Sequence, residues 1–334
     1  MKVVTTTEPG AIEIAERADP TATVDSVVRL DNAGICGTDL KILHGKIPVA
    51  RPRVMGHEMV GIVEHAAADG EIPAGTRVLV NPATSCGTCD LCRRHLPHLC
   101  RRGGLLGRDS DGVFAERLAV AERYLHVVPA GISGDAAGVL QVLGTVVHAQ
   151  RTVQVFPDHV AVVVGLGISG LLHLQMLLAR GVGTVIGITR SQWKLDLATT
   201  FGAHGVATPD AAAEVVAETT GGRGADLVVE CVGQEATLAQ AIELAGHGAD
   251  VVVFGTSTGG GQGLPYYQLY FKELTLHNPR AATGGDYDTG IALAATARLT
   301  LEPLVTGRFA LADAVAAFEA AADPAHLKVL LHSG

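Results

Sequence analysis

Residues 160–174 read V-A-V-V-V-G-L-G-I-S-G-L-L-H-L, an apolar run that passes through three glycines into a second apolar stretch. The first five residues favour a buried strand, and the residues after Gly170 favour a helix. Glycines between them suit a tight turn whose backbone N–H groups approach a pyrophosphate at the helix N-terminus. The stretch therefore predicts a dinucleotide-binding site. The residues expected to line it are Gly165, Gly167, Ile168, Ser169, Gly170, Thr189, Arg190, Ser191 and Val232.

Strands and helices are predicted to alternate on both sides of this turn. Such alternation is typical of a parallel sheet covered by helices, so we expect an α/β domain of the Rossmann type. The expected helices are 136–155, 169–180 and 192–201, and the expected strands are 159–164, 184–189, 227–231 and 251–254.

The two ends of the chain have a different pattern. Residues 1 to about 130 carry short apolar runs separated by Gly, Pro, Asn and Asp, which is typical of an irregular β-rich region. Two helices and a short strand are expected after residue 279. The expected N-terminal strands are 24–28, 59–65, 77–80, 113–120 and 125–128, and the expected C-terminal elements are 289–299, 311–321 and 328–331.

The residues after the second strand of the predicted parallel sheet indicate which dinucleotide binds. NAD sites place an acidic residue there to bind the ribose 2′-hydroxyl. This chain has Thr189, Arg190 and Ser191 instead, and its first carboxylate is Asp196, inside the next predicted helix. A guanidinium beside two hydroxyls suits a 2′-phosphate, so we predict a preference for NADP. The alternative is that Arg190 is a solvated surface residue.

Residues 86–100 read C-G-T-C-D-L-C-R-R-H-L-P-H-L-C and place four cysteines within one short segment. Thiolates at this spacing can close a tetrahedral zinc site, and four sulfur ligands leave no position open for chemistry. The segment therefore predicts a structural zinc lobe. Four unrelated thiols or disulfides are the alternative, which the short, regular spacing disfavours. The expected ligands are Cys86, Cys89, Cys92 and Cys100.

Composition limits the function classes. The 334 residues include 41 glycines and are 48% apolar, enough for a substantial core of α/β architecture. A net charge of −9 argues against nucleic-acid binding, because phosphate requires a basic surface. The first 20 residues have no signal-peptide pattern, and no apolar run is long enough to span a membrane. With no disulfide framework left, the cytoplasm is the expected location, with no membrane partner.

A second group of candidate metal ligands lies near the start of the chain. Residues 34–45 read G-I-C-G-T-D-L-K-I-L-H-G, and residues 54–61 read V-M-G-H-E-M-V-G. They supply Cys36, His57 and Glu58, and a thiolate with an imidazole is a combination that zinc prefers. With the four-cysteine lobe, the glycine-rich turn and the final K-V-L-L strand, these motifs resemble the zinc-containing medium-chain alcohol dehydrogenases over nearly the whole chain.

The resemblance implies a role for each matching residue. Cys36 and His57 resemble protein ligands of a catalytic zinc, and Glu58 resembles an acid that lies beside that metal and sometimes ligates it. Asp39 resembles the carboxylate that orients the zinc-bound histidine through its other ring nitrogen. Thr38 resembles the hydroxyl that takes the substrate's proton. Two zinc ions per chain, one catalytic and one structural, are therefore expected.

Two positions depart from the family pattern. The usual third zinc ligand is Cys, Asp or Glu, and the matching residue here is Gln141. A neutral amide oxygen can ligate zinc, as in relatives that resemble sugar dehydrogenases; Glu58 could replace or supplement it, or Gln141 is only a polar helix residue. The histidine that many relatives use to pass the proton to solvent is Lys41 here. His44, one turn further on, is an alternative relay or a surface residue.

The resemblance also implies a domain organisation. It predicts a GroES-like, β-rich catalytic domain over residues 1–135, with the zinc lobe at 86–100. A Rossmann NADP-binding domain follows at 136–280, and residues 281–334 return to the catalytic domain. Family members form dimers or tetramers through their coenzyme domains, so a homodimer or homotetramer is expected, with contacts near residues 264–277.

The implied function is a zinc-dependent oxidoreductase. It transfers hydride between an alcohol (a secondary alcohol, polyol or sugar-like compound) and NADP, and gives a ketone or aldehyde. Because Gln141 is an uncommon zinc ligand, an alternative hypothesis is a catalytically inactive NADP-binding protein of the same fold. A zinc-independent reductase of the superfamily would lack the cysteine lobe and the G-H-E box, and a zinc-finger module would not explain the acidic charge or the second domain.

Overall fold

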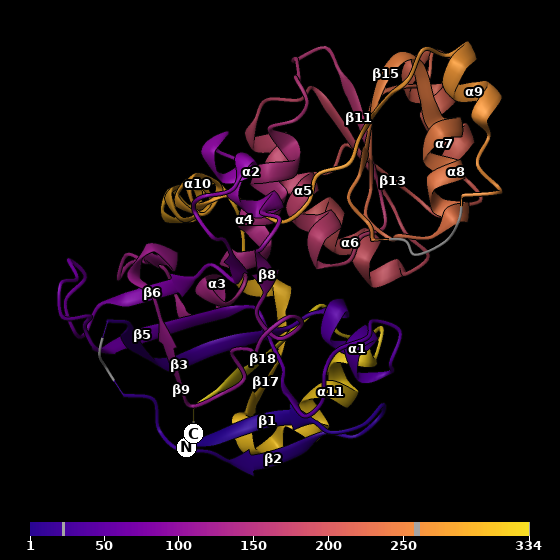
Figure 1. The fold of residues 1–334 in the computed structure, drawn as a ribbon. Helices are drawn as coiled ribbons and strands as arrows, with labels where there is room; N and C mark the ends of the chain where they lie inside the picture. The colour runs from indigo at the N-terminus through magenta and orange to yellow at the C-terminus, as the bar shows by residue number, and fades with distance from the viewer. Residues whose placement is uncertain (22–23, 257–260, 334) are drawn as a thin grey trace. The chain divides into compact units, whose positions relative to one another are not determined.

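The computed structural model describes residues 1–21, 24–256 and 261–333. The chain divides into two compact units (Figure 1). The first unit comprises Met1–Gly144, Ala281–Ala297 and Leu301–Gly334, and the second comprises Thr145–Arg280 and Arg298–Thr300. The predicted fold class, a GroES-like β-rich domain with a Rossmann-type parallel sheet, is confirmed.

The second unit is built on a parallel six-stranded sheet. Its strand order is β13-β12-β11-β14-β15-β16, so the chain starts at the centre and extends first to one edge and then to the other. This reversal of direction beside β11 is the position at which open α/β sheets bind their ligands. The strands are β11 (Val160–Val164), β12 (Thr184–Ile188), β13 (Gly205–Ala207), β14 (Ala225–Glu230), β15 (Ala245–Val253) and β16 (Thr275–His277).

Helices cover both faces of this sheet, as its almost continuously apolar central strand requires. On one face, Val162 and Ile186 share a core with residues of α7 and α8. On the other, Gly187 lies against α5, where a Cβ would be 3.4 Å from Leu174. The helices of the unit are α5 (Ile168–Ala179), α6 (Gln192–Thr200), α7 (Ala212–Thr220), α8 (Glu235–Leu244) and α9 (Tyr266–Phe271), and α4 (Leu140–Gln150) begins in the first unit.

The first unit is β-rich. A seven-stranded sheet has the order β10-β6-β5-β3-β18-β17, with β9 also paired to β3; β2-β1-β4 and β7-β8 form smaller sheets. The strands are β1 (Lys2–Thr6), β2 (Glu13–Glu16), β3 (Ser26–Ile35), β4 (Arg53–Val54), β5 (Met59–His65), β6 (Arg77–Val80), β7 (Ala83–Thr84), β8 (Gly104–Leu105), β9 (Arg117–Val120), β10 (Leu125–Val127), β17 (Val305–Ala310) and β18 (Lys328–His332).

The C-terminal segment belongs to this unit because β18 inserts into the N-terminal sheet. β18 pairs with β3 in antiparallel register, with Val329 opposite Ile35, and pairs with β17 in parallel. Phe318 packs edge-on against Phe114 at a ring-centroid distance of 6.0 Å within one apolar core. The helices are α1 (Gly37–Leu43), α2 (Asp90–Arg93), α3 (Gly134–Gly138), α10 (Gly284–Ala295) and α11 (Ala314–Ala322), with 3-10 turns at Pro97–Leu99, Glu122–Tyr124, Glu302–Leu304 and Leu311–Asp313.

Several expected elements were wrong in extent. The expected helix 136–155 is two helices, α3 and α4, with Val139 between them as the C-cap residue of α3, and α4 ends at Gln150. The expected strand 113–120 begins only at Arg117. The amides of Val113 and Phe114 donate to the Gly56 and Met55 carbonyls, and Ala115 forms only an isolated bridge to Val3 of β1. The expectations also omitted α1, α7 and α8. Among the described residues, no helix is both long and apolar enough to cross a bilayer.

Candidate functional site

Three candidate metal ligands meet in the first unit. Cys36 lies at the N-cap of α1, directly after β3, and His57 with Glu58 directly precedes β5. The Gly34 amide donates to the Glu58 carbonyl at 2.9 Å, which holds the end of β3 beside the start of β5. One ligand atom from each of the three side chains lies within 4.8 Å of the others. The sulfur, nitrogen and oxygen donors of this group suit zinc.

The carboxylate of Asp39 orients two of these ligands. Its Oδ2 accepts a hydrogen bond from the Cys36 amide at 2.9 Å, and its Oδ1 lies 3.4 Å from Nδ1 of His57. Burial favours a neutral His57, but Asp39 and Cys36 outweigh burial and raise the pKa of His57 well above its ordinary value. Neither Oδ1 of Asp39 nor Nδ1 of His57 has a hydrogen-bond partner among the described residues, so Asp39 faces Nδ1 of His57 through charge, the side from which carboxylates orient metal-ligating histidines.

Glu58 forms a buried ion pair that sequence reasoning missed. Its Oε2 accepts from Nζ of Lys328 at 2.7 Å, and both side chains are only 1% exposed. Burial lowers the pKa of Lys328, but the charge of Glu58 outweighs burial and raises it, so the lysine stays cationic. Oε1 of Glu58 is buried without a hydrogen-bond partner in the described part of the chain. Because a buried carboxylate oxygen needs a partner, a cation beside Cys36 and His57 fits this site.

Gln141 lies in α4 of the same unit and is buried. Its Nε2 donates to the Tyr287 hydroxyl at 3.3 Å. Burial and the nearby charge of Glu58 raise the pKa of Tyr287, so its hydroxyl stays protonated. Gln141 is thus held by Tyr287 of α10, a second residue that no motif of the sequence indicates.

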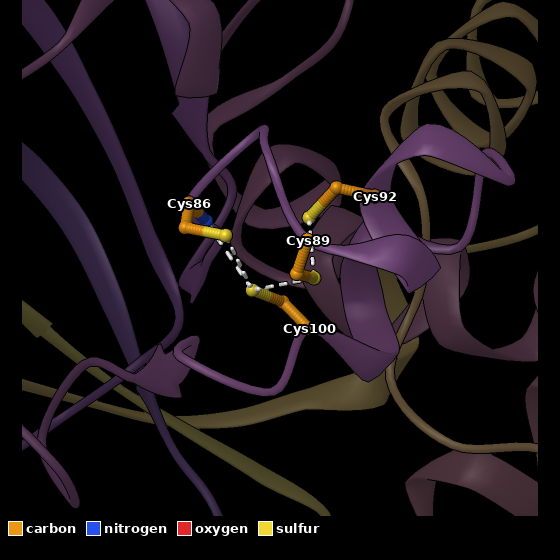
Figure 2. A group of neighbouring side chains, drawn as sticks. All are labelled: Cys86, Cys89, Cys92 and Cys100. Atoms are coloured by element: carbon orange, nitrogen blue, oxygen red, sulfur yellow. Dashed lines mark hydrogen bonds between the residues drawn. The ribbon is translucent and has the colours of Figure 1, made fainter.

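The four-cysteine segment brings its sulfur atoms together (Figure 2). The Sγ atoms of Cys100 and Cys86 lie 3.5 Å apart, as do those of Cys89 and Cys92, and Cys89 lies 3.8 Å from Cys100. A tetrahedral zinc with bonds of about 2.3 Å separates its sulfurs by about 3.8 Å, so the cluster has the size that zinc requires. Hydrogen bonds, the Thr88 amide first, lower the pKa of Cys86 to about 5, which favours the thiolate.

The predicted dinucleotide turn connects β11 to α5 in the second unit. Gly165 has a φ of +93°, in the left-handed region that favours glycine, and a Cβ on Gly170 would lie 1.8 Å from the Gly165 carbonyl oxygen. Gly167 is the N-cap of α5, whose first turn begins at Ile168 and Ser169. The chain can therefore make this turn only with glycine at 165 and 170, and the helix N-terminus remains open to an anion.

The residues expected to select the cofactor follow β12. Thr189 is half-buried and donates its backbone N–H to Ala207, Arg190 is exposed, and Ser191 is the N-cap of α6. They come directly after the carboxyl end of β12, next to β11 in the sheet. Val232 comes directly after Glu230 and Cys231, at the carboxyl end of β14. β14 runs from Ala225 to Glu230, so the expected strand 227–231 begins two residues late and ends one residue late.

The expected proton-relay residues lie on α1. Thr38 is half-buried and occupies the first turn after Cys36, while Lys41 is half-buried in the last turn. His44 is the exposed C-cap residue of the helix. The helix therefore carries a hydroxyl near the metal-ligand group and two titratable side chains nearer the opposite end.

Comparison with known proteins identifies the family. A family model described as zinc-binding dehydrogenase matches residues 169–296, and one described as alcohol dehydrogenase GroES-like domain matches residues 23–130. The chain is 30% identical to sorbitol dehydrogenase of Halalkalibacterium halodurans, over 99% of both chains. The chain belongs to the medium-chain dehydrogenase family.

Other members of the medium-chain dehydrogenase family agree with this assignment. The 2-dehydro-3-deoxy-L-galactonate 5-dehydrogenase of Pseudoalteromonas atlantica is 30% identical, covering 87% of this chain and 86% of its own. A zinc-binding dehydrogenase fold from Sinorhizobium meliloti 1021, solved with NADP, superposes with a TM-score of 0.92 at 28% identity, covering 99% of this chain and 98% of its own. Membership of this family of dehydrogenases makes the protein an oxidoreductase that acts on small molecules.

Proposed function

We propose that this medium-chain dehydrogenase is a zinc-dependent enzyme that transfers hydride between an alcohol and NADP, giving a ketone or aldehyde. The observation that carries the proposal is the group of half-buried Cys36 with buried His57 and Glu58, whose ligand atoms lie within 4.8 Å of one another. Such donors in a family of oxidoreductases fit a metal that acts on the substrate rather than one that only stabilises the fold.

We assign two zinc ions to each chain. Cys36, His57 and Glu58, with Gln141 as the fourth candidate, would hold the catalytic ion. Cys86, Cys89, Cys92 and Cys100 would hold the structural one. Bound in the first site, zinc would supply Lewis-acid polarisation of the substrate oxygen. The positive charge of Lys328 offsets the negative charge of Glu58. The net charge around the catalytic ion is therefore less negative than the ligands alone would make it.

The protein's own groups would then orient the reactants and move the proton. Asp39 would orient the His57 ring from its Nδ1 side, which leaves Nε2 for the metal. Thr38, in the first turn of α1, would accept the hydroxyl proton of the alcohol. His44 or Lys41 would release it to solvent, and the exposed His44 is the better suited of the two. A nicotinamide cofactor bound at the glycine-rich turn would supply the hydride acceptor.

The proposed cofactor preference rests on the segment after β12. Arg190 is exposed between the hydroxyl groups of Thr189 and Ser191, with no carboxylate in the position that would bind a ribose 2′-hydroxyl. A guanidinium can donate two parallel hydrogen bonds to a 2′-phosphate. The similar Sinorhizobium meliloti protein binds NADP, which supports this preference.

A polyol or sugar-like compound is the proposed substrate class. The relatives named above act on sorbitol and on a sugar acid, and the amide of Gln141 replaces an anionic ligand type. We also propose that residues 1–135 and 281–334 form the catalytic domain, that residues 136–280 bind NADP, and that the enzyme is a homodimer or homotetramer.

Zinc content and turnover test the proposal together. Purified protein should contain two zinc ions per chain and oxidise a polyol or secondary alcohol with NADP. Cys36→Ser and His57→Ala should each abolish turnover and remove one zinc while retaining NADPH binding. Cys231→Ser is the matched control for zinc content alone, because this cysteine lies outside both metal-ligand groups. If both variants kept full turnover, the mechanism would be wrong. If the unaltered protein bound NADPH but turned over no substrate, the result would favour the alternative of a catalytically inactive NADP-binding protein.

A further inference from the structure

Glu230, the last residue of β14, holds the turn that follows it. Its side chain is fully buried, and Oε1 accepts hydrogen bonds from the Val232 amide at 2.8 Å and the Gly233 amide at 2.9 Å. The Thr237 hydroxyl, in the first turn of α8, donates to the same oxygen at 2.7 Å. Hydrogen bonds to a carboxylate are about twice as strong as those between neutral groups. The turn and the start of α8 are thus both tied to one buried anion.

The surroundings of this carboxylate leave no room for rearrangement. Gly233 has a φ of +79°, and a Cβ on Gly255 would lie 2.6 Å from Oε2 of Glu230 and 2.1 Å from the Gly233 nitrogen. The amides of Phe254 and Gly255 both donate to the Glu230 carbonyl at 2.9 Å. A glutamine at 230 would have nearly the same size, but its amide has one acceptor oxygen where the carboxylate has two. In one orientation a position that accepts hydrogen bonds is lost, and in the other the NH₂ group faces N–H donors.

The same turn contacts the glycine-rich dinucleotide turn. A Cβ on Gly165 would lie only 2.4 Å from Cγ2 of Val232, so the valine side chain packs directly on the first glycine. Val232 nevertheless remains 42% exposed. It therefore forms part of the surface beside Gly165, and its position depends on the hydrogen bonds that its amide and the next one make to Glu230.

We propose that Glu230 is a positioning residue for the cofactor: it fixes the turn at 231–233 so that Val232 shapes the dinucleotide site beside Gly165. This inference rests on the proposed function. The carboxylate itself is covered by its own donors and does not touch the cofactor. A negative charge can stand this close to a phosphate-binding turn because three donors already neutralise part of it.

The test is Glu230→Gln, with NADPH affinity measured independently of turnover. The chain has a single tryptophan, Trp193 in α6 of the same unit, so quenching of its fluorescence by NADPH gives the Kd. We expect the Kd to rise about tenfold, the order expected for the loss of one charge-assisted hydrogen bond, with the zinc content unchanged. At saturating NADP, kcat should stay within about twofold, so the defect should appear in KM.

Asp226→Asn is the matched control. Asp226 lies on β14 as well, near its opposite end, and its Oδ2 accepts from the Val160 amide at 2.8 Å. This variant should lower the melting temperature without raising the Kd for NADPH. If both variants raised the Kd equally, Glu230 would have only a general structural role and the inference would be wrong.

A second pair of variants keeps the test decisive if Glu230→Gln fails to fold. Thr237→Val removes one donor to the carboxylate, whereas Thr237→Ser keeps the hydroxyl. Only the valine variant should bind NADPH more weakly, and equal affinities for the two would contradict the inference. An unaltered protein that binds neither NADPH nor NADH would instead contradict the proposed function itself.

Discussion

Replacing His173 with leucine should remove a specific part of the acid sensitivity of the second unit. His173 lies on α5, is fully buried, and burial lowers its pKa to about 3. The Gln150 amide lies 3.2 Å from Nδ1, the Phe254 ring is edge-on at 4.7 Å, and Nε2 has no hydrogen-bond partner among the described residues. Burial keeps water away from the ring and disfavours its charged form, so the folded state holds the imidazole neutral.

The size of the effect follows from the two pKa values. An unfolded histidine has a pKa of about 6.5, so between about pH 6.5 and pH 3 the unfolded chain binds more protons at this position than the folded one. The free energy of unfolding therefore decreases as the pH falls below about 6.5, by about 1.4 kcal/mol for each pH unit. At pH 5 the loss due to His173 should be about 2 kcal/mol, and at pH 7.5 it should be negligible.

The assay is urea unfolding at several pH values between 7.5 and 5, followed by the fluorescence of Trp193, which reports on the same unit. At each pH, the free energy of unfolding of the unaltered protein is subtracted from that of His173→Leu. This difference should be about 2 kcal/mol larger at pH 5 than at pH 7.5. His247→Leu is the matched control, because His247 is an exposed histidine of the same unit. A difference between His173→Leu and the unaltered protein that did not change with pH would refute the reasoning.

Three further substitutions test the metal sites and the cofactor site. Cys100→Ser should remove one zinc per chain as measured by metal analysis, whereas Cys231→Ser should retain both; equal zinc content would contradict the structural site. In the zinc-free protein, Lys328→Met should lower the free energy of unfolding by about 3–5 kcal/mol because it leaves the buried Glu58 without a counter-charge, and adding Glu58→Gln should restore most of this loss in a denaturation measurement. Arg190→Glu should raise the KM for NADP about tenfold or more and lower that for NAD, whereas an unchanged ratio of kcat/KM for the two cofactors would contradict the proposed preference.

Local sequence determined the parts of the protein in which the interacting residues are neighbours along the chain. The glycines of the β11–α5 turn were predictable because a short strand-to-helix connection permits few backbone conformations. The sulfur cluster was predictable because Cys86, Cys89, Cys92 and Cys100 lie within a single short loop. Helix ends were less predictable: α3 ends at Gly138 and α4 begins at Leu140, within a stretch whose apolar pattern predicted one continuous helix.

Only the tertiary structure decided which distant side chains meet at the candidate active site. Glu58 and Lys328 are 270 residues apart, and they pair because β18 inserts beside β3 in a register that buries the lysine. Gln141 and Tyr287 are 146 residues apart and meet through the packing of α4 and α10. Sequence patterns record which faces are apolar, but pairing between buried polar groups depends on register and on the need of each group for a partner, and these are fixed only when the strands and helices assemble.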